Sequence, residues 1–117
     1  ERLEQIDALL RSSGVERDFI GRAVALWLKD SKDAPTAAEQ TRAALATIGQ
    51  ALELAGASFK DVVRTRIFTT DISQWEAIGA VHGEVFGDIR PATTMLEVSK
   101  LIDPTLLIEI EADAYLG

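Results

Sequence analysis

Three residues in the C-terminal third of the chain carry polar groups suited to a small-molecule site. Arg90 stands three positions before Thr93, and Glu109 lies in the last predicted strand. A guanidinium holds a carboxylate through two parallel hydrogen bonds, whereas a threonine hydroxyl offers one uncharged donor. A partly buried glutamate can serve as a general base. Residue types alone assign a ligand to none of the three.

Each of these residues also has an ordinary structural explanation. Thr93 is β-branched and suits a strand, so a packing role and a ligand-binding role stay equally open. Arg90 precedes Pro91, and a solvated loop arginine is favoured there because free surface arginines are common. Glu109 alternates with apolar residues, which favours an ion pair between subunits somewhat over a place in a binding cleft.

The other chemistry-bearing residues give weaker signals. Arg64 and Arg66 share one face of a predicted strand and are expected to pair with acidic residues such as Glu97, Glu109 or Glu111. His82 is the only histidine. Because the sequence supplies no partner at a fixed reach, it is predicted to be a helix-surface or interface residue. With no cysteine and no glycine-rich phosphate loop, we expect no metal and no cofactor.

Composition limits the classes of partner. The chain has 117 residues, 47% of them hydrophobic, and a net charge of −7 with a pI near 4.6. An acidic surface repels phosphate backbones and anionic membranes, so neither nucleic acid nor membrane is an expected partner. The longest apolar run, residues 23–28, is far below the roughly 20 residues of a membrane helix. No apolar signal core opens the chain, and we therefore expect a cytoplasmic location.

Hydrophobic periodicity divides the chain into alternating helices and strands. An N-terminal amphipathic helix is predicted for residues 1–14, followed by a single domain at 15–117. Capping boxes at Thr36–Glu39 and Ser73–Glu76 mark two helix starts, and Gly56 and Gly87 mark the ends. Strands are predicted at residues 21–28, 61–69, 93–99 and 106–116. This order predicts an α+β fold in which two helices cover one face of a mixed sheet.

Several short motifs follow one another in order along residues 36–117. They are Glu39-Gln40-Thr41-Arg42, Ala55-Gly56-Ala57-Ser58 followed by Asp61-Val62-Val63, Asp71, Phe86, Pro91-Ala92 and Glu109-Ile110-Glu111-Ala112. Taken together, they resemble the Rid family of YjgF-like reactive intermediate deaminases. This resemblance implies a chorismate-mutase-like fold, a homotrimer and three ligand clefts formed where subunits meet.

The resemblance also implies roles for particular positions. In deaminating members the residue after Pro-Ala is an arginine that holds the substrate carboxylate, and here it is Thr93. The family's helix asparagine falls at Gly79, and Glu109 aligns with an acidic residue that orients or activates water. We therefore expect a trimer that binds or transforms a small carbonyl, imine or enamine metabolite, without standard 2-imino acid deaminase activity. The alternative is a non-catalytic, small-ligand-binding or regulatory trimer.

The first 35 residues fit the family pattern less well. Family members open with a strand hairpin whose second strand carries a Ser-Gly pair. Arg22-Ala23-Val24 resembles the first of these strands, and no Ser-Gly strand follows it. Part of the hairpin is either missing from this register or deleted, with the N-terminal helix as an addition, and both explanations stay open.

Overall fold

The computed structural model describes the backbone of residues 20–24 and all of residues 36–116. The helix predicted at residues 1–14 lies outside the described residues, as does the part of the first predicted strand that follows residue 24. The two explanations for the N-terminal hairpin therefore remain open.

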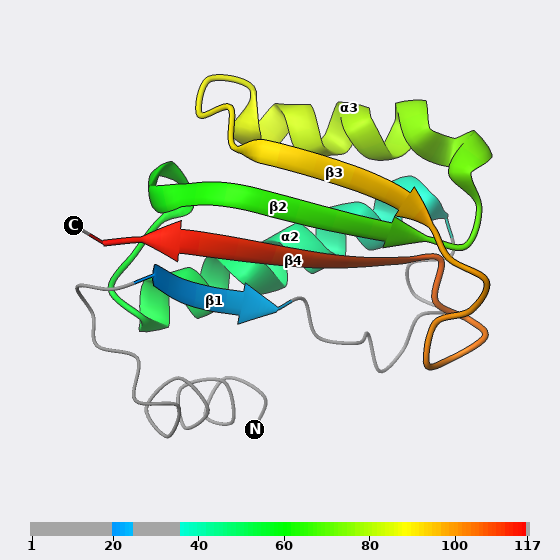
Figure 1. The fold of residues 1–117 in the computed structure, drawn as a ribbon, viewed down its shortest axis with the longest axis horizontal. Helices are drawn as coiled ribbons and strands as arrows, with labels where there is room; N and C mark the ends of the chain where they lie inside the picture. Colours follow the sequence, from blue (N-terminus) through cyan, green and yellow to red (C-terminus); the bar gives the residue numbers. More distant parts are fainter. Residues whose placement is uncertain (1–19, 25–35, 117) are drawn as a thin grey trace.

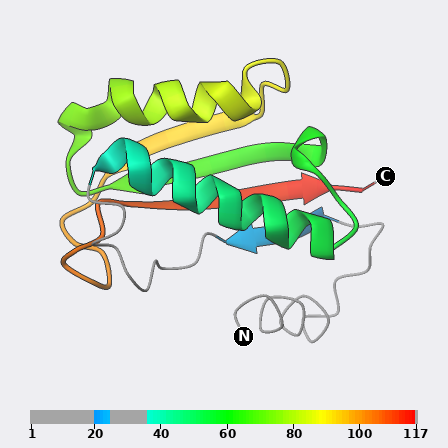
Figure 2. The ribbon, with the colours of Figure 1, turned by 180° about the vertical axis from the view of Figure 1, so that it is seen from behind.

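One sheet, two helices and two short 3₁₀ turns form the described structure. In chain order they are β1 (Ile20–Val24), α2 (Ala37–Leu54), η2 (Phe59–Asp61), β2 (Val62–Thr69), η3 (Ile72–Gln74), α3 (Trp75–Phe86), β3 (Ala92–Glu97) and β4 (Ile108–Tyr115). The strands lie in the order β1-β4-β2-β3; β2 and β3 are parallel, and the other pairs are antiparallel. Helices α2 and α3 both lie on the same side of the sheet (Figures 1 and 2). The predicted α+β fold is confirmed.

Helix α2 begins after Thr36 and ends before Gly56 as predicted, although only the Thr36 half of the predicted capping box is formed. The Thr36 side chain accepts a hydrogen bond from the Glu39 amide at 3.1 Å and so satisfies one free donor of the first turn. Gly56 has φ of 81°, a left-handed conformation that costs glycine little. The amides of Gly56 and Ala57 then close on the carbonyls of Glu53 and Leu52, the bond pair of a Schellman ending.

The ends of α3 differ from the sequence expectation. Ser73 does not cap this helix, because it lies inside the short η3 turn, where the Asp71 carboxylate accepts from the Ser73 amide and hydroxyl. Gly87 keeps a right-handed helical conformation at the other end. Arg90 instead adopts positive φ, 55°, and its amide bonds to the Phe86 carbonyl at 2.9 Å. A local turn competes with the predicted cap at each end.

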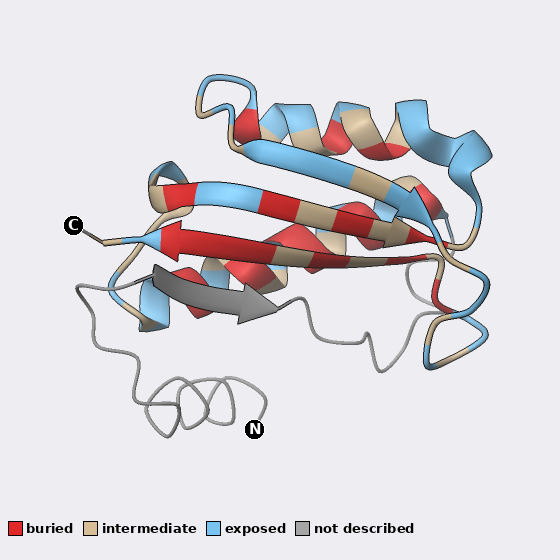
Figure 3. Ribbon diagram, viewed as in Figure 1, coloured by how far each residue is buried: buried red, intermediate tan, exposed pale blue. Residues whose placement is uncertain are grey.

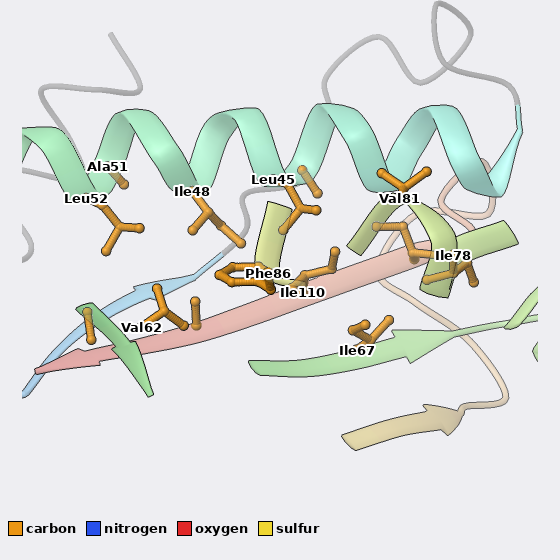
Figure 4. Close-up of a cluster of buried hydrophobic side chains, with 14 of the residues drawn as sticks. Leu45, Ile48, Ala51, Leu52, Val62, Ile67, Ile78, Val81, Phe86 and Ile110 are labelled. Carbon is orange, nitrogen blue, oxygen red and sulfur yellow. The ribbon is translucent and has the colours of Figure 1, made fainter. Parts of the chain in front are cut away.

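The core lies between the two helices and the sheet. Figure 4 shows α2 directing Leu45, Ile48 and Leu52 toward Ile67 of β2 and Ile110 of β4. Ile48 and Ile110 are each 0% exposed. From α3, the residues Ile78, Val81 and Phe86 join the same cluster. The apolar faces of the two helices, with residues three or four positions apart, therefore pack on the apolar face of the sheet, where every second residue points inward.

A buried glutamine joins α2 to the segment that leads into β4. Gln40 is 1% exposed. Its side-chain amide donates to the Thr105 carbonyl at 3.0 Å, and its side-chain oxygen accepts from the Leu107 amide at 2.7 Å. One side chain thus bonds the end of the long connection between β3 and β4 to helix α2.

The other face of the sheet carries charged pairs and no described helix. Arg66 bonds to Glu111 at 2.6 Å, which confirms one of the expected acidic partners. Arg64 pairs with Asp113 instead of the acids that the sequence suggested. Figure 3 shows the neighbouring strand β3 as mostly exposed, and it forms one edge of the described sheet. In the described part of the chain, no helix is both long and apolar enough to span a bilayer.

Two glycines allow a matched test of packing around α2 and α3. A Cβ at Gly49 would lie 2.8 Å from the Phe59 ring, whereas one at Gly83 meets no atom within 4 Å. We expect Gly49→Ala to lower the free energy of unfolding by about 1–3 kcal/mol through overpacking. Gly83→Ala should raise it by roughly 0.5–1 kcal/mol, since alanine is the better helix former. Urea denaturation of both variants checks this, and equal effects would contradict the packing described.

Candidate functional site

A chain of polar side chains runs from α3 to the exposed strand β3. The Nε2 atom of His82 lies 2.9 Å from the Thr65 hydroxyl, which lies 2.8 Å from the Thr93 hydroxyl. The Thr93 hydroxyl in turn donates to the carbonyl of Pro91 at 3.1 Å. Thr65 is 0% exposed, and Thr93 is exposed. A buried hydroxyl therefore connects a histidine to a hydroxyl at the surface.

Strand pairing explains why these residues meet. Thr65 of β2 lies directly opposite Thr93 of β3 in the parallel register. Because side chains alternate along a strand, Thr65 and Ile67 point toward the helices while Arg64 and Arg66 point away. Helix α3 covers this part of the sheet and brings His82 to Thr65 (Figure 2). The fold thus places Thr93 on the helix side of the sheet.

Aromatic rings support the histidine. The His82 ring lies against the Phe86 ring with centroids 4.7 Å apart, and Phe86 meets Phe59 edge to face at 5.4 Å. Burial of the imidazole lowers the pKa of His82 below its ordinary value of 6.5, because a charged ring loses hydration there. At neutral pH the histidine is uncharged.

This pKa shift predicts a pH-dependent stability. Well above pH 6.5, His82 is neutral in both the folded and the unfolded chain, so its titration does not affect the free energy of unfolding. As pH falls below 6.5, the unfolded chain binds the proton first, and stability is lost until the lowered folded pKa is passed. Wild type is therefore expected to lose stability over this window relative to His82→Gln. Parallel thermal melts between pH 7.5 and 5 measure the difference, and parallel curves would show that burial does not perturb His82.

Gly79 and Arg90 lie near the chain of hydroxyls in sequence but take no part in it. Gly79 precedes His82 by three positions on α3, which places the two on one side of the helix. A Cβ at Gly79 would meet no atom within 4 Å, so the space beside it is open. The Arg90 side chain makes no hydrogen bond or ion pair with the described residues. The sequence interpretation of Arg90 as a loop residue is consistent with this position.

Glu109 lies on the other side of the sheet from Thr93. It pairs with Phe68 of β2, and Phe68 alternates with the helix-facing Ile67. Strand β2 also separates β4 from β3. One chain therefore does not bring Glu109 and Thr93 together. The two residues can serve one ligand only if Glu109 comes from a second copy of the chain.

The described residues do not form a metal site. No group of three or more histidine, aspartate or glutamate side chains among residues 36–116 is arranged to hold an ion. The polar groups that gather on the helix side are two hydroxyls and a neutral imidazole. These groups form hydrogen bonds and carry no charge at neutral pH.

Sequence reasoning did not identify Thr65 as part of the site and gave His82 no partner. The signal was present in the strand patterns, since Thr65 is a polar residue on the apolar face of its strand. A buried polar side chain requires a hydrogen-bond partner, and such a residue therefore points to a polar neighbour across the sheet. The parallel register that supplies Thr93 as this neighbour is a tertiary feature.

Comparison with known proteins gives a consistent result. Residues 23–116 match the model of the family described as endoribonuclease L-PSP. An uncharacterised protein of Streptomyces coelicolor is 37% identical over 79 residues, which are 68% of this chain and 59% of that protein. The 3-aminoacrylate deaminase RutC of Acinetobacter baylyi is 43% identical over 79 residues, 68% of this chain and 62% of that protein. The matches thus span about three fifths of these relatives' length.

A solved structure extends the similarity to most of the fold. A YjgF/YER057c/UK114 family member from Mycobacterium tuberculosis superposes with a TM-score of 0.76 and 46% sequence identity. The superposition covers 92% of this chain and 91% of that one. This chain therefore belongs to the endoribonuclease L-PSP family, the family of the YjgF-like Rid proteins.

Proposed function

We propose that this protein binds or transforms a small carbonyl, imine or enamine compound in a cleft that begins at Thr93. The observation that carries the proposal is the exposed Thr93 hydroxyl, held by Thr65 where the resemblance implies an arginine in deaminating relatives. A relative named 3-aminoacrylate deaminase supports an enamine or imine as the ligand class. The uncharged hydroxyl argues against a standard 2-imino acid deaminase.

The proposal includes a homotrimer with the cleft between subunits. Two features support assembly. Strand β3 is an exposed edge of the described sheet, a surface that proteins usually cover. Trp75 is 55% exposed and Leu96 46%, so apolar side chains also lie at the surface near that edge. In such an assembly, Glu109 of one copy would orient water for a ligand bound at Thr93 of another.

A non-catalytic trimer that binds a small ligand is the second candidate. The features that favour it are Thr93 and Gly79, which stand where the resemblance implies the carboxylate-holding arginine and the helix asparagine of deaminating relatives. Ribonuclease activity, which the family's description carries, is not part of the proposal, because a chain of net charge −7 repels a phosphate backbone.

Two measurements test the proposal. Sedimentation equilibrium at micromolar concentration should give three times the chain mass, and a stable monomer would contradict a cleft between subunits. Hydrolysis of uncharged imines and enamines is then measured through the ammonia or amine that it releases. Turnover supports the enzyme, and saturable binding without turnover supports the second candidate. Absence of both would reject the site.

A further inference from the structure

The hydrogen bonds around Thr65 have a defined direction. The Pro91 carbonyl can only accept, so the Thr93 hydroxyl donates to it. Each threonine hydroxyl carries one proton. Thr65 must then donate to Thr93, and the Nε2 atom of His82 must carry the proton that it donates to Thr65. Only this arrangement gives every contact in the chain its own proton.

We propose that His82, acting through Thr65, sets the Thr93 hydroxyl as a hydrogen-bond donor for the carbonyl oxygen or imine nitrogen of an uncharged ligand. The inference rests on the proposed function and narrows its ligand class. On binding, the ligand's acceptor atom replaces the Pro91 carbonyl as the group to which the Thr93 hydroxyl donates. His82 does not touch the ligand, so it is a positioning residue.

Cooperativity strengthens the hydrogen bond that the Thr93 hydroxyl donates. Hydrogen bonds in a chain polarise one another, so a donor supported by two further donors is stronger than an isolated hydroxyl. Thr65 is 0% exposed, and water therefore cannot compete for its hydroxyl. The exposed Thr93 hydroxyl is consequently held in one orientation before a ligand arrives. A preset donor loses less entropy on binding than a freely rotating one.

No charged side chain among the described residues bonds to His82, Thr65 or Thr93. Glu84 of α3 pairs with Arg42 of α2. On β2, Arg64 and Arg66 project to the other face of the sheet and pair with β4. On β3, the Glu97 carboxylate accepts from the Ile72 amide. The remaining described titratable groups of these elements and of the turn before β3 are Glu39, Glu53, Glu76, Asp88 and Arg90.

Burial therefore lowers the pKa of His82, and no charged partner opposes this shift. The neutral imidazole fixes the direction of the hydrogen bonds through Thr65 and Thr93 and adds no charge. This state matches an uncharged acceptor, whereas a carboxylate would find no cation at Thr93. Below the lowered pKa, the imidazolium would add a positive charge behind the two hydroxyls and improve carboxylate binding.

Pyruvamide and pyruvate form a matched pair of probes, because they differ mainly in the charge of one group. Binding to the purified full chain is followed by NMR, in which His82 gives the only histidine signal. At pH 7.5 we expect pyruvamide to shift the signals of His82 and Thr93 and to bind about three- to tenfold more tightly than pyruvate. Tighter binding of pyruvate would overturn the inference and leave the proposed cleft intact. Binding of neither probe would reject the proposed function itself.

Variants of Thr65 separate the hydrogen-bond chain from simple packing. Thr65→Val keeps nearly the same shape without the hydroxyl and should weaken pyruvamide binding about three- to tenfold. Thr65→Ser keeps the hydroxyl and should restore binding to within about twofold, despite its lost methyl group. Thermal melts confirm that both variants fold. Equal pyruvamide affinity of wild type and Thr65→Val would overturn the inference.

A pH series tests the role of His82 directly. As pH falls through the titration of the single histidine, the affinity of wild type for pyruvate should rise relative to pyruvamide. In His82→Gln this rise should disappear, because the glutamine does not titrate. A packing role would leave the ratio of the two affinities unchanged with pH. The same rise in the variant would assign the effect to another group and overturn the inference.

Discussion

Thr93→Arg is expected to hydrolyse a 2-imino acid about tenfold to a hundredfold faster than wild type. A guanidinium at this position can hold the substrate carboxylate through two charge-assisted hydrogen bonds. Such a contact contributes roughly 1.5–3 kcal/mol, and each 1.4 kcal/mol is a factor of ten in rate. Thr93 is exposed on an edge strand, so the longer side chain has room. A coupled assay that generates the imine in situ measures the rate.

Thr93→Lys is the matched control for charge. Lysine adds the same charge as a point, without the planar fork of arginine, and is expected to recover less of the rate. Equal rates for both variants would show that charge alone was missing. Robust turnover by the wild type would show that another group, with Arg90 the first candidate, already holds the carboxylate. In that case the interpretation of Thr93 would be wrong.

The open space beside Gly79 extends this test. A Cβ there meets no atom within 4 Å, so an asparagine can be introduced without a clash. We expect Gly79→Asn combined with Thr93→Arg to exceed the single Thr93→Arg variant in 2-imino acid hydrolysis. Gly79→Asn alone should leave the rate low, because it adds no positive charge. The four proteins together form a double-mutant cycle that measures the coupling of the two positions.

Local patterns were sufficient to predict the helices α2 and α3 and the strands β2, β3 and β4. The spacing of Leu45, Ile48 and Leu52 predicted the buried face of α2, and Gly56 predicted its end. Local signals were insufficient at Ser73, where the capping spacing was present but Asp71 formed a competing turn. The start of a helix depends on which of several short polar side chains accepts hydrogen bonds from the free backbone amides, and the spacing of these residues does not show which one it is.

The site was harder to predict than the fold because it depends on strand pairing. Thr93 was identified through its neighbours Pro91 and Ala92 in the family motif. Thr65 and His82 lie far from it in sequence and meet it only through the parallel register of β2 with β3 and the placement of α3. Period-two alternation shows which side of a strand a residue occupies, but it does not show which residue of another strand lies opposite.

The link between α2 and β4 also depends on a tertiary contact, and its loss should have a large effect on stability. Gln40 joined the family motif only as part of a helix start, yet its side chain bonds to the Thr105 carbonyl and the Leu107 amide, more than 60 positions away. Gln40→Leu keeps much of the volume and removes both bonds. The Leu107 amide then loses the acceptor that the side chain supplied, next to the start of β4.

We expect Gln40→Leu to lower the free energy of unfolding by about 2–3 kcal/mol, the sum of two lost hydrogen bonds and one poorly satisfied amide. Gln50→Ala is the matched control, since Gln50 is exposed on the same helix and should change stability by no more than about 0.5 kcal/mol. Urea denaturation of wild type and both variants gives the comparison. A Gln40→Leu variant as stable as Gln50→Ala would mean that the segment before β4 is held by its own turn, where the Asp103 carboxylate accepts from the Thr105 amide, and not by the helix.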